Sequence, residues 1–319
     1  MGIFLQAFRK QGGIKLIKEY WQAGVLTYAL AQLILTGLSR KGLEILRLGV
    51  QLKICNKLRK RFIPVLERFD VDCKKQALPS EPSNKVWVCW LQGIENAPIL
   101  VQKCYKSLRA YLKDRDITLI TAKNRKDYII MPDYIEEKYR KGVISHTHFS
   151  DLLRVELLCK YGGTWIDCTV YCSGENIPKY FFDSKFFIFQ NLKPGANGSV
   201  LNVSSWFMTA WSNHKFLLAV REMLWSYWEK NDKLVDYFLL HHFIAIVAEH
   251  YNDDWKQIIQ FPNSFPHVLL LMLFETFNWK KWNAITEVCP FHKLSYKNHV
   301  EDIAKKDTYY QYIMNQNKI

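Results

Sequence analysis

Apolar and polar positions along this chain alternate between the periods of strands and of helices. Short apolar runs predict strands, and longer stretches with apolar residues every three or four positions predict helices. The expected strands cover residues 85–91, 116–121, 164–167, 185–190 and 205–210. The expected helices cover residues 97–112, 146–160, 213–230, 234–250 and 265–278, and one more begins at Met131-Pro132-Asp133. Strands that alternate with helices predict an α/β layered fold.

The N-terminal part of the chain has a different pattern, which predicts a helical extension. Apolar residues recur there at helical spacing, at Leu43, Leu46, Val50, Ile54 and Leu58. An amphipathic basic helix of this kind lies on a membrane surface or packs on its own domain. Residues 74–84 contain two prolines and favour a linker. We therefore expect a helical extension with its linker over residues 1–80 and a main domain over residues 81–319.

Residues 20–39 carry no charge and are just long enough to cross a bilayer. Glutamine, threonine and glycine residues interrupt this stretch, which makes it a poor spanning helix. It is also a poor signal peptide, because no clear cleavage site follows it. Surface association, packing within the chain and a true span all remain open for this part of the sequence.

Composition places the chain among folded proteins, because 49% of its 319 residues are hydrophobic and 15% are aromatic. The net charge of +14 is concentrated in residues 1–70, which hold 13 Lys and Arg against four acids. Basic segments bind nucleic acid or anionic membranes. The common nucleic-acid-binding motifs are missing from the sequence, so we expect no nucleic-acid partner. Eight scattered cysteines without zinc-site spacing fit a reduced, cytoplasmic setting.

The most informative stretch is Ser150-Asp151-Leu152-Leu153-Arg154 followed by Tyr161-Gly162-Gly163-Thr164-Trp165-Ile166-Asp167. Asp151 and Arg154 are three residues apart, so they share one face of a helix. The glycine pair supplies the turn that ends this helix. Asp167 then follows the next strand at its carboxyl end, which is the edge where α/β sheets bind ligands. The pattern predicts two acids and a base in one crevice.

This pattern, together with the segment 86–98 that contains Trp90 and Gln92, resembles glycosyltransferase family 32. The similarity is greatest to the bacterial capsular polysaccharide synthesis branch of that family, and it covers roughly residues 85–250. The resemblance implies a GT-A-like nucleotide-sugar-binding fold and transfer of a sugar from a nucleoside diphosphate. It also implies retention of the anomeric configuration.

The resemblance assigns roles to individual residues. Asp151 and Arg154 would bind hydroxyls of the donor sugar, with Arg154 also near the diphosphate, and Asp167 would bind the sugar and, if a metal is used, coordinate it beside the diphosphate. Trp90 would stack on the base, unless it is an interior tryptophan, and Gln92 would contact the base or ribose, unless it caps a loop. Two further residues are candidates by their order along the chain, and packing or surface roles stay open for both. They are Asp236, which could orient the acceptor, and His241, which could approach the diphosphate or metal.

Relatives usually carry Asp-x-Asp after the glycine pair, whereas this chain reads Asp167-Cys168-Thr169. Magnesium and manganese prefer charged oxygen ligands, and Thr169 offers a neutral hydroxyl. A divalent cation is therefore either held weakly by Asp167, water and the diphosphate, or is not needed.

We expect a hexosyltransferase that uses a nucleotide sugar, UDP-linked by preference, to extend a capsular or surface polysaccharide. The acceptor would be a glycan, lipid-linked in one interpretation, and the enzyme would lie at the inner face of the cytoplasmic membrane. The alternatives are a non-catalytic scaffold in a glycan assembly complex and a sugar-phosphate transferase.

Overall fold

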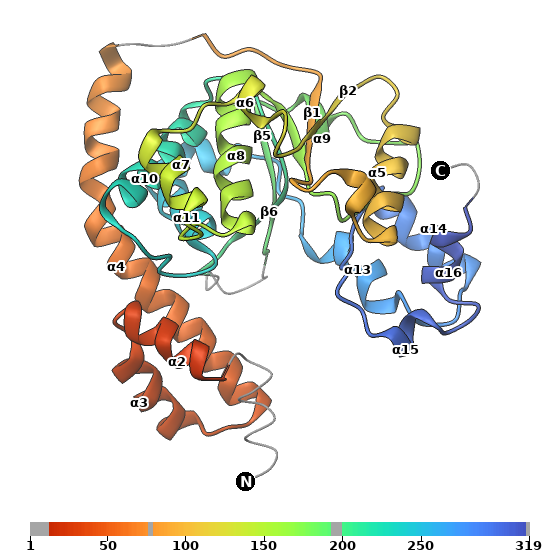
Figure 1. Cartoon of the computed structure of the whole chain (residues 1–319), viewed down its shortest axis with the longest axis horizontal. Coiled ribbons are helices and arrows are strands. Elements are labelled where there is room, and N and C mark those ends of the chain that lie inside the picture. The colour runs from red at the N-terminus through yellow and green to blue at the C-terminus, as the bar shows by residue number, and fades with distance from the viewer. Residues whose placement is uncertain (1–12, 76–78, 193–199, 317–319) are drawn as a thin grey trace.

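The computed structural model describes residues 13–75, 79–192 and 200–316. Its centre is a five-stranded sheet in the order β2-β1-β3-β6-β5 (Figure 1). Strands β1, β2 and β3 are parallel, whereas β6 runs antiparallel to both β3 and β5. The strands are β1 (Lys85–Cys89), β2 (Asp116–Ile120), β3 (Gly163–Ile166), β5 (Phe186–Gln190) and β6 (Val203–Ala210). The predicted mixed α/β fold with a helical N-terminal region is confirmed.

The two faces of the sheet bury two separate apolar cores. Trp87 and Trp165 point into one core, and Val86 and Ile166 point into the other, because side chains alternate along a strand. The first core is covered by α4 (Arg40–Lys75), α8 (His146–Tyr161), α10 (Lys215–Lys230) and α11 (Leu239–His250). The second is covered by α5 (Ile99–Tyr111), α9 (Tyr180–Asp183) and a small antiparallel sheet of β4 (Val170–Cys172) and β7 (Phe291–Lys293).

The remaining helices lie around these layers. A third apolar cluster joins α13 (Ser264–Met272), α14 (Trp279–Val288) and α16 (Tyr309–Met314) near the C-terminus. The short helices are η1 (Ile94–Asn96), α6 (Arg125–Tyr128), α7 (Asp133–Arg140), α12 (Asn252–Lys256) and α15 (Val300–Ile303).

Several predicted boundaries differ from those observed. The helix predicted over residues 234–250 begins only at Leu239, because the Asp236 carboxylate accepts a hydrogen bond from the backbone of Phe238 and forms a turn there. The helix predicted over residues 265–278 is α13, which ends at Met272, and the next helix, α14, begins only at Trp279. The small strands β4 and β7 were not predicted.

The uncharged stretch 20–39 is divided between two helices, α2 (Gly13–Gln22) and α3 (Leu26–Thr36). The chain turns between them at Gly24, which has a φ of 64°. Among the residues that the structure describes, no helix is both long enough and apolar enough to cross a membrane.

The apolar stripe of α4 is covered by the protein itself. Ile54, Leu58 and Phe62 are buried, and the ring of Phe62 lies 5.0 Å from that of Phe243 in α11. Figure 1 shows α4 running along the helical layer formed by α10 and α11. Of the two alternatives for this stripe, packing on its own domain is the one observed.

Polar contacts hold the C-terminal half of α4 against the same helices. The Asp70 carboxylate accepts hydrogen bonds of 2.7 Å from both His250 and Tyr251, and it lies 3.0 Å from the Lys215 ammonium. One residue earlier in α11, Glu249 pairs with Arg59 of α4 at 2.7 Å. Burial alone would raise the pKa of Asp70, but hydrogen bonds from its three partners outweigh burial and lower the pKa to about 2.

We expect Asp70→Asn to lower the free energy of unfolding by about 1 kcal/mol at neutral pH. The value is small because Asp70 and its partners are partly exposed, so that solvent screens their interaction. A depressed folded-state pKa stabilises the protein above the unfolded value of 3.8, and this stabilisation is lost as the pH falls towards 2. Urea unfolding at several pH values should therefore show the free energies of unfolding of the two proteins converging as the pH falls from 3.8 towards 2. Asp253→Asn, at a side chain that is 96% exposed, is the control and should have little effect. A constant difference at all pH values would contradict the assignment.

Candidate active site

Helix α8 carries the site, and its ends are fixed by local chemistry. The Ser145 hydroxyl accepts a hydrogen bond from the His148 backbone and caps the first turn. Gly162 ends the helix with a φ of 65°, and Gly163 follows with a φ of 91°. A side chain at Gly163 would stand 2.3 Å from the Lys85 carbonyl oxygen in β1. The glycine pair is therefore required for α8 to lead directly into β3.

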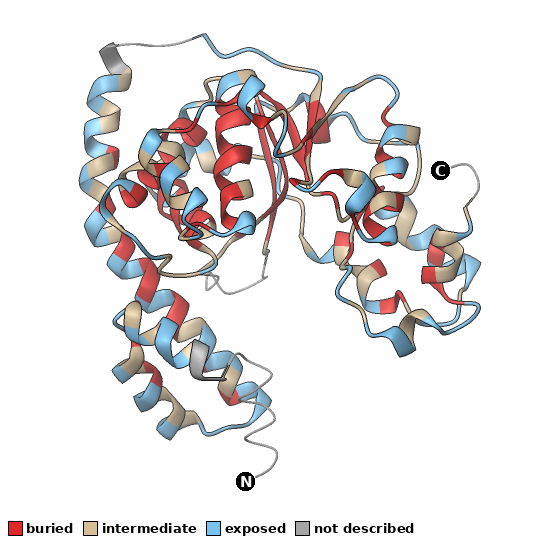
Figure 2. Cartoon of the chain, viewed as in Figure 1, coloured by how far each residue is buried: buried red, intermediate tan, exposed pale blue. Residues whose placement is uncertain are grey.

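The body of α8 is buried on nearly all sides, as Figure 2 shows. Asp151 and Arg154 lie within this buried helix with only 7% and 5% of their surfaces exposed. Charged groups are rarely buried to this extent unless they are paired, because removing them from water is costly. The partners of Asp151 and Arg154 therefore show which groups these two side chains hold in place.

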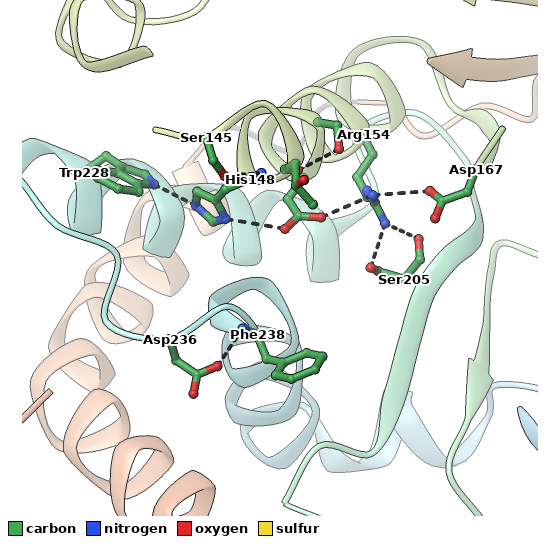
Figure 3. A network of polar contacts seen from close by, with 11 residues as sticks. Ser145, His148, Arg154, Asp167, Ser205, Trp228, Asp236 and Phe238 are labelled. Atoms are coloured by element: carbon green, nitrogen blue, oxygen red, sulfur yellow. Dashed lines mark hydrogen bonds and ion pairs between the residues drawn. The ribbon is translucent and has the colours of Figure 1, made fainter. Parts of the chain in front are cut away.

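Arg154 joins three elements of the fold (Figure 3). Its Nη2 atom lies 3.2 Å from Asp151 Oδ1 and 3.4 Å from Asp167 Oδ1. Its Nη1 atom donates to the carbonyl and hydroxyl oxygens of Ser205, at 2.5 and 2.6 Å. The predicted convergence of Asp151, Arg154 and Asp167 is present, and Ser205 completes it from the start of β6.

A buried histidine holds Asp151 from the other side. The Trp228 indole donates to His148 Nε2 at 2.9 Å, so this nitrogen is the acceptor of the ring. The other nitrogen, Nδ1, lies 3.4 Å from Asp151 Oδ2. This contact of His148 with the Asp151 carboxylate was not predicted from the sequence.

Asp167 follows β3 and is surrounded by positive groups. Its Oδ1 atom accepts a hydrogen bond from the Trp165 indole at 2.9 Å, and its Oδ2 atom lies 3.1 Å from the Lys293 ammonium. Burial acts to raise the pKa of Asp167, but Lys293 and then Arg154 outweigh it and hold the pKa below its usual value. The side chain is 25% exposed, so a charged carboxylate here remains open to a ligand.

Aromatic side chains lie around this cluster. The carboxyl ends of the parallel strands β1 and β3 share one edge of the sheet, which brings Trp90 to the side where Asp167 lies. The Tyr296 ring meets the Trp90 ring edge-on at 5.7 Å. Tyr237 is 64% exposed, and the charges of Asp151 and Asp167 help burial to raise its pKa. Exposed aromatic rings beside paired carboxylates form a surface suited to bases or sugars.

Of the two candidates from the later part of the chain, His241 lies near the cluster, whereas Asp236 does not face it. His241 lies near enough for the charges of Asp151 and Arg154 to act on it, and its Nδ1 atom is buried without a hydrogen-bond partner. Burial lowers the pKa of His241 to about 4, so the ring is neutral at neutral pH. Asp236 lies in the loop before α11, and its carboxylate accepts from the Phe238 backbone instead of facing Arg154 (Figure 3).

Gln92 lies beyond the end of β1, which stops at Cys89 and not at residue 91 as predicted. Its side chain is exposed in the turn before η1, and its carbonyl oxygen accepts a hydrogen bond from Asn96 at 2.8 Å. The expected contact with a base or ribose remains a prediction.

Lys293 and Tyr237 were not predicted from the sequence. Lys293 reaches the site through the pairing of β7 with β4, in which it lies opposite Val170. A basic residue in a three-residue strand gives no local signal of this position. Tyr237 was overlooked because residues 234–250 were expected to form a continuous helix.

Comparison with known proteins places these findings in context. The search of curated proteins found no match. Seven chains of known structure match. One of them, the PaToxG glycosyltransferase, shares 14% sequence identity over 82% of this chain and 96% of its own, with a TM-score of 0.38. The family model for capsular polysaccharide synthesis proteins matches residues 44–313, which include every residue of the cluster. A match over most of its length means that the chain belongs to the capsular polysaccharide synthesis protein family.

Proposed function

We propose that this protein is a glycosyltransferase that moves a sugar from a nucleoside diphosphate, UDP by preference, to a growing capsular or surface polysaccharide. The observation that carries the proposal is the pairing of Asp151, Arg154 and Asp167 within 3.4 Å, beside exposed aromatic rings. Carboxylates accept hydrogen bonds from sugar hydroxyls, and aromatic faces stack on bases and sugars. Membership of a family for capsular polysaccharide synthesis supports a sugar-transfer reaction.

The reaction would break the bond between the anomeric carbon and the diphosphate oxygen, and would form a bond from that carbon to an acceptor hydroxyl oxygen. The proton of this hydroxyl would pass to the departing diphosphate. Both carboxylates of the cluster are paired with Arg154, and this ion pairing makes each of them a weak covalent nucleophile. We therefore propose attack from the same face that the diphosphate leaves, with retention of configuration.

Our proposal places this reaction at the inner face of the cytoplasmic membrane, with the outer face of α3 as the contact. Leu30, Ile34 and Leu35 are 52%, 83% and 78% exposed on this uncharged helix. Arg40 and Lys41 follow at the start of α4 and are also exposed. Apolar side chains flanked by cations are typical of helices that lie on anionic lipid. A lipid-linked acceptor would then be within reach of the enzyme.

The first test of this function is donor binding. The full chain, titrated calorimetrically with a panel of nucleoside diphosphate sugars, should bind at least one of them, with a UDP-sugar expected. Release of the nucleoside diphosphate during turnover would support sugar transfer, whereas release of the monophosphate would identify a sugar-phosphate transferase. Folded protein that binds no donor would contradict the proposal and favour the scaffold.

The second test is the charge of Asp167. Asp167→Asn keeps the shape of the side chain and should lower turnover by about a hundredfold or more, as removal of a key electrostatic group does in other enzymes. Asp151→Asn should also be severe. Asp183→Asn changes an exposed carboxylate on α9 and serves as the control, with near-normal turnover expected. Near-normal turnover of Asp167→Asn in a folded protein would show that the assignment of Asp167 is wrong.

The membrane contact can be tested with vesicles of anionic phospholipid. The double variant Ile34→Glu, Leu35→Glu should lose most vesicle binding, and high salt should weaken binding of the unaltered protein. Ile130→Glu is a matched control, because Ile130 is 84% exposed but lies on the main domain. Equal binding by both variants would reject α3 as the contact. Loss of a dimer from the double variant in size-exclusion chromatography would instead identify a second copy as the partner of this face.

A further inference from the structure

Lys293 is paired with Asp167, the residue to which the sequence resemblance assigns a metal-binding role. Its ammonium lies 3.1 Å from Asp167 Oδ2 and also donates a hydrogen bond to the Thr169 hydroxyl. Thr169 stands at the position where relatives carry the second acid of Asp-x-Asp. Asp167 and Thr169, which stand at the two acid positions of that motif, are therefore both bound to Lys293.

The donor set does not suit a divalent cation. Asp167 Oδ1 faces Trp165 and Arg154, and Asp167 Oδ2 faces Lys293. Asp151 is paired in turn with Arg154 and His148. Magnesium and manganese need several oxygen ligands with free lone pairs and negative charge. The two acids of the cluster are balanced by two cations, and the described part of the chain holds no group of three or more side chains able to bind a metal.

The two cations of the cluster differ in what they can offer a ligand. Both terminal nitrogens of Arg154 are already engaged by protein oxygens, and its side chain is only 6% exposed. Lys293 is 21% exposed, and an ammonium has three N–H donors, of which Asp167 and Thr169 take two. The third donor of Lys293 is therefore available to a ligand, whereas Arg154 positions the carboxylates.

We propose that Lys293 binds the diphosphate of the donor and supplies the positive charge that a metal supplies in relatives with Asp-x-Asp. The inference rests on the proposed function, because it names what one residue of that site contacts. The departing diphosphate gains negative charge, and a fixed cation beside it lowers the barrier. Thr169 and Asp167 hold the ammonium in place, which explains how a threonine at position 169 is compatible with a working site.

The test is calorimetric binding of UDP and other nucleoside diphosphates to the full chain, with chelator and with added manganese or magnesium. The unaltered protein should bind in chelator, and metal should change its affinity by less than about threefold. Lys293→Met should weaken binding by about tenfold or more, since a charge-assisted hydrogen bond is lost, and added metal should not restore it. Lys293→Arg keeps the charge and should retain most of the affinity.

Lys297→Met removes an exposed lysine four residues away and should bind like the unaltered protein. Thermal unfolding of each variant separates loss of the site from loss of the fold. Should Lys293→Met fail to fold, Thr169→Val removes only the hydroxyl acceptor and should weaken binding in chelator by a few-fold. Binding that requires metal, or that is indifferent to both substitutions, would overturn the role of Lys293. Failure of every nucleoside diphosphate to bind would instead count against the proposed function.

Discussion

The burial of one guanidinium organises this molecule. Arg154 lies inside a helix that is covered on nearly all sides, and a cation in that setting must be surrounded by oxygen atoms. Those oxygens come from α8 itself, from the residue after β3 and from the start of β6. Helix and sheet are thereby held in one relative position, and the carboxylates of Asp151 and Asp167 are aligned as a result.

The same arrangement sets the net charge of the cluster formed by Asp151, Arg154, Asp167 and Lys293. Asp151 and Asp167 bring two negative charges, and Arg154 and Lys293 bring two positive ones. A balanced cluster does not attract small ions strongly. Under the proposed function it would select its ligand by the directions of its hydrogen bonds and by the aromatic rings around it, which suits a molecule that combines hydroxyls, phosphates and a planar base.

The sequence predicted those parts of the site that are encoded locally. Asp151 and Arg154 are one helical turn apart, and a glycine turn with a short strand leads to Asp167, so spacing alone brings them together. Lys293 follows Thr169 by 124 residues and reaches it through strands of three residues, too short to show a period. The stripe on α4 showed that a helix had an apolar face, but periodicity carries no information on whether lipid or protein covers that face.

The contacts of α4 also bear on how the chain is made. Asp70 meets His250, a residue 180 positions later, and the apolar stripe of α4 packs on the same late helix. At usual rates of synthesis the ribosome needs about 10 to 40 seconds to cover that distance. During this interval the nascent chain displays an uncovered apolar and basic helix. Until α11 emerges, the apolar stripe of α4 is therefore open to chaperones or to a nearby surface.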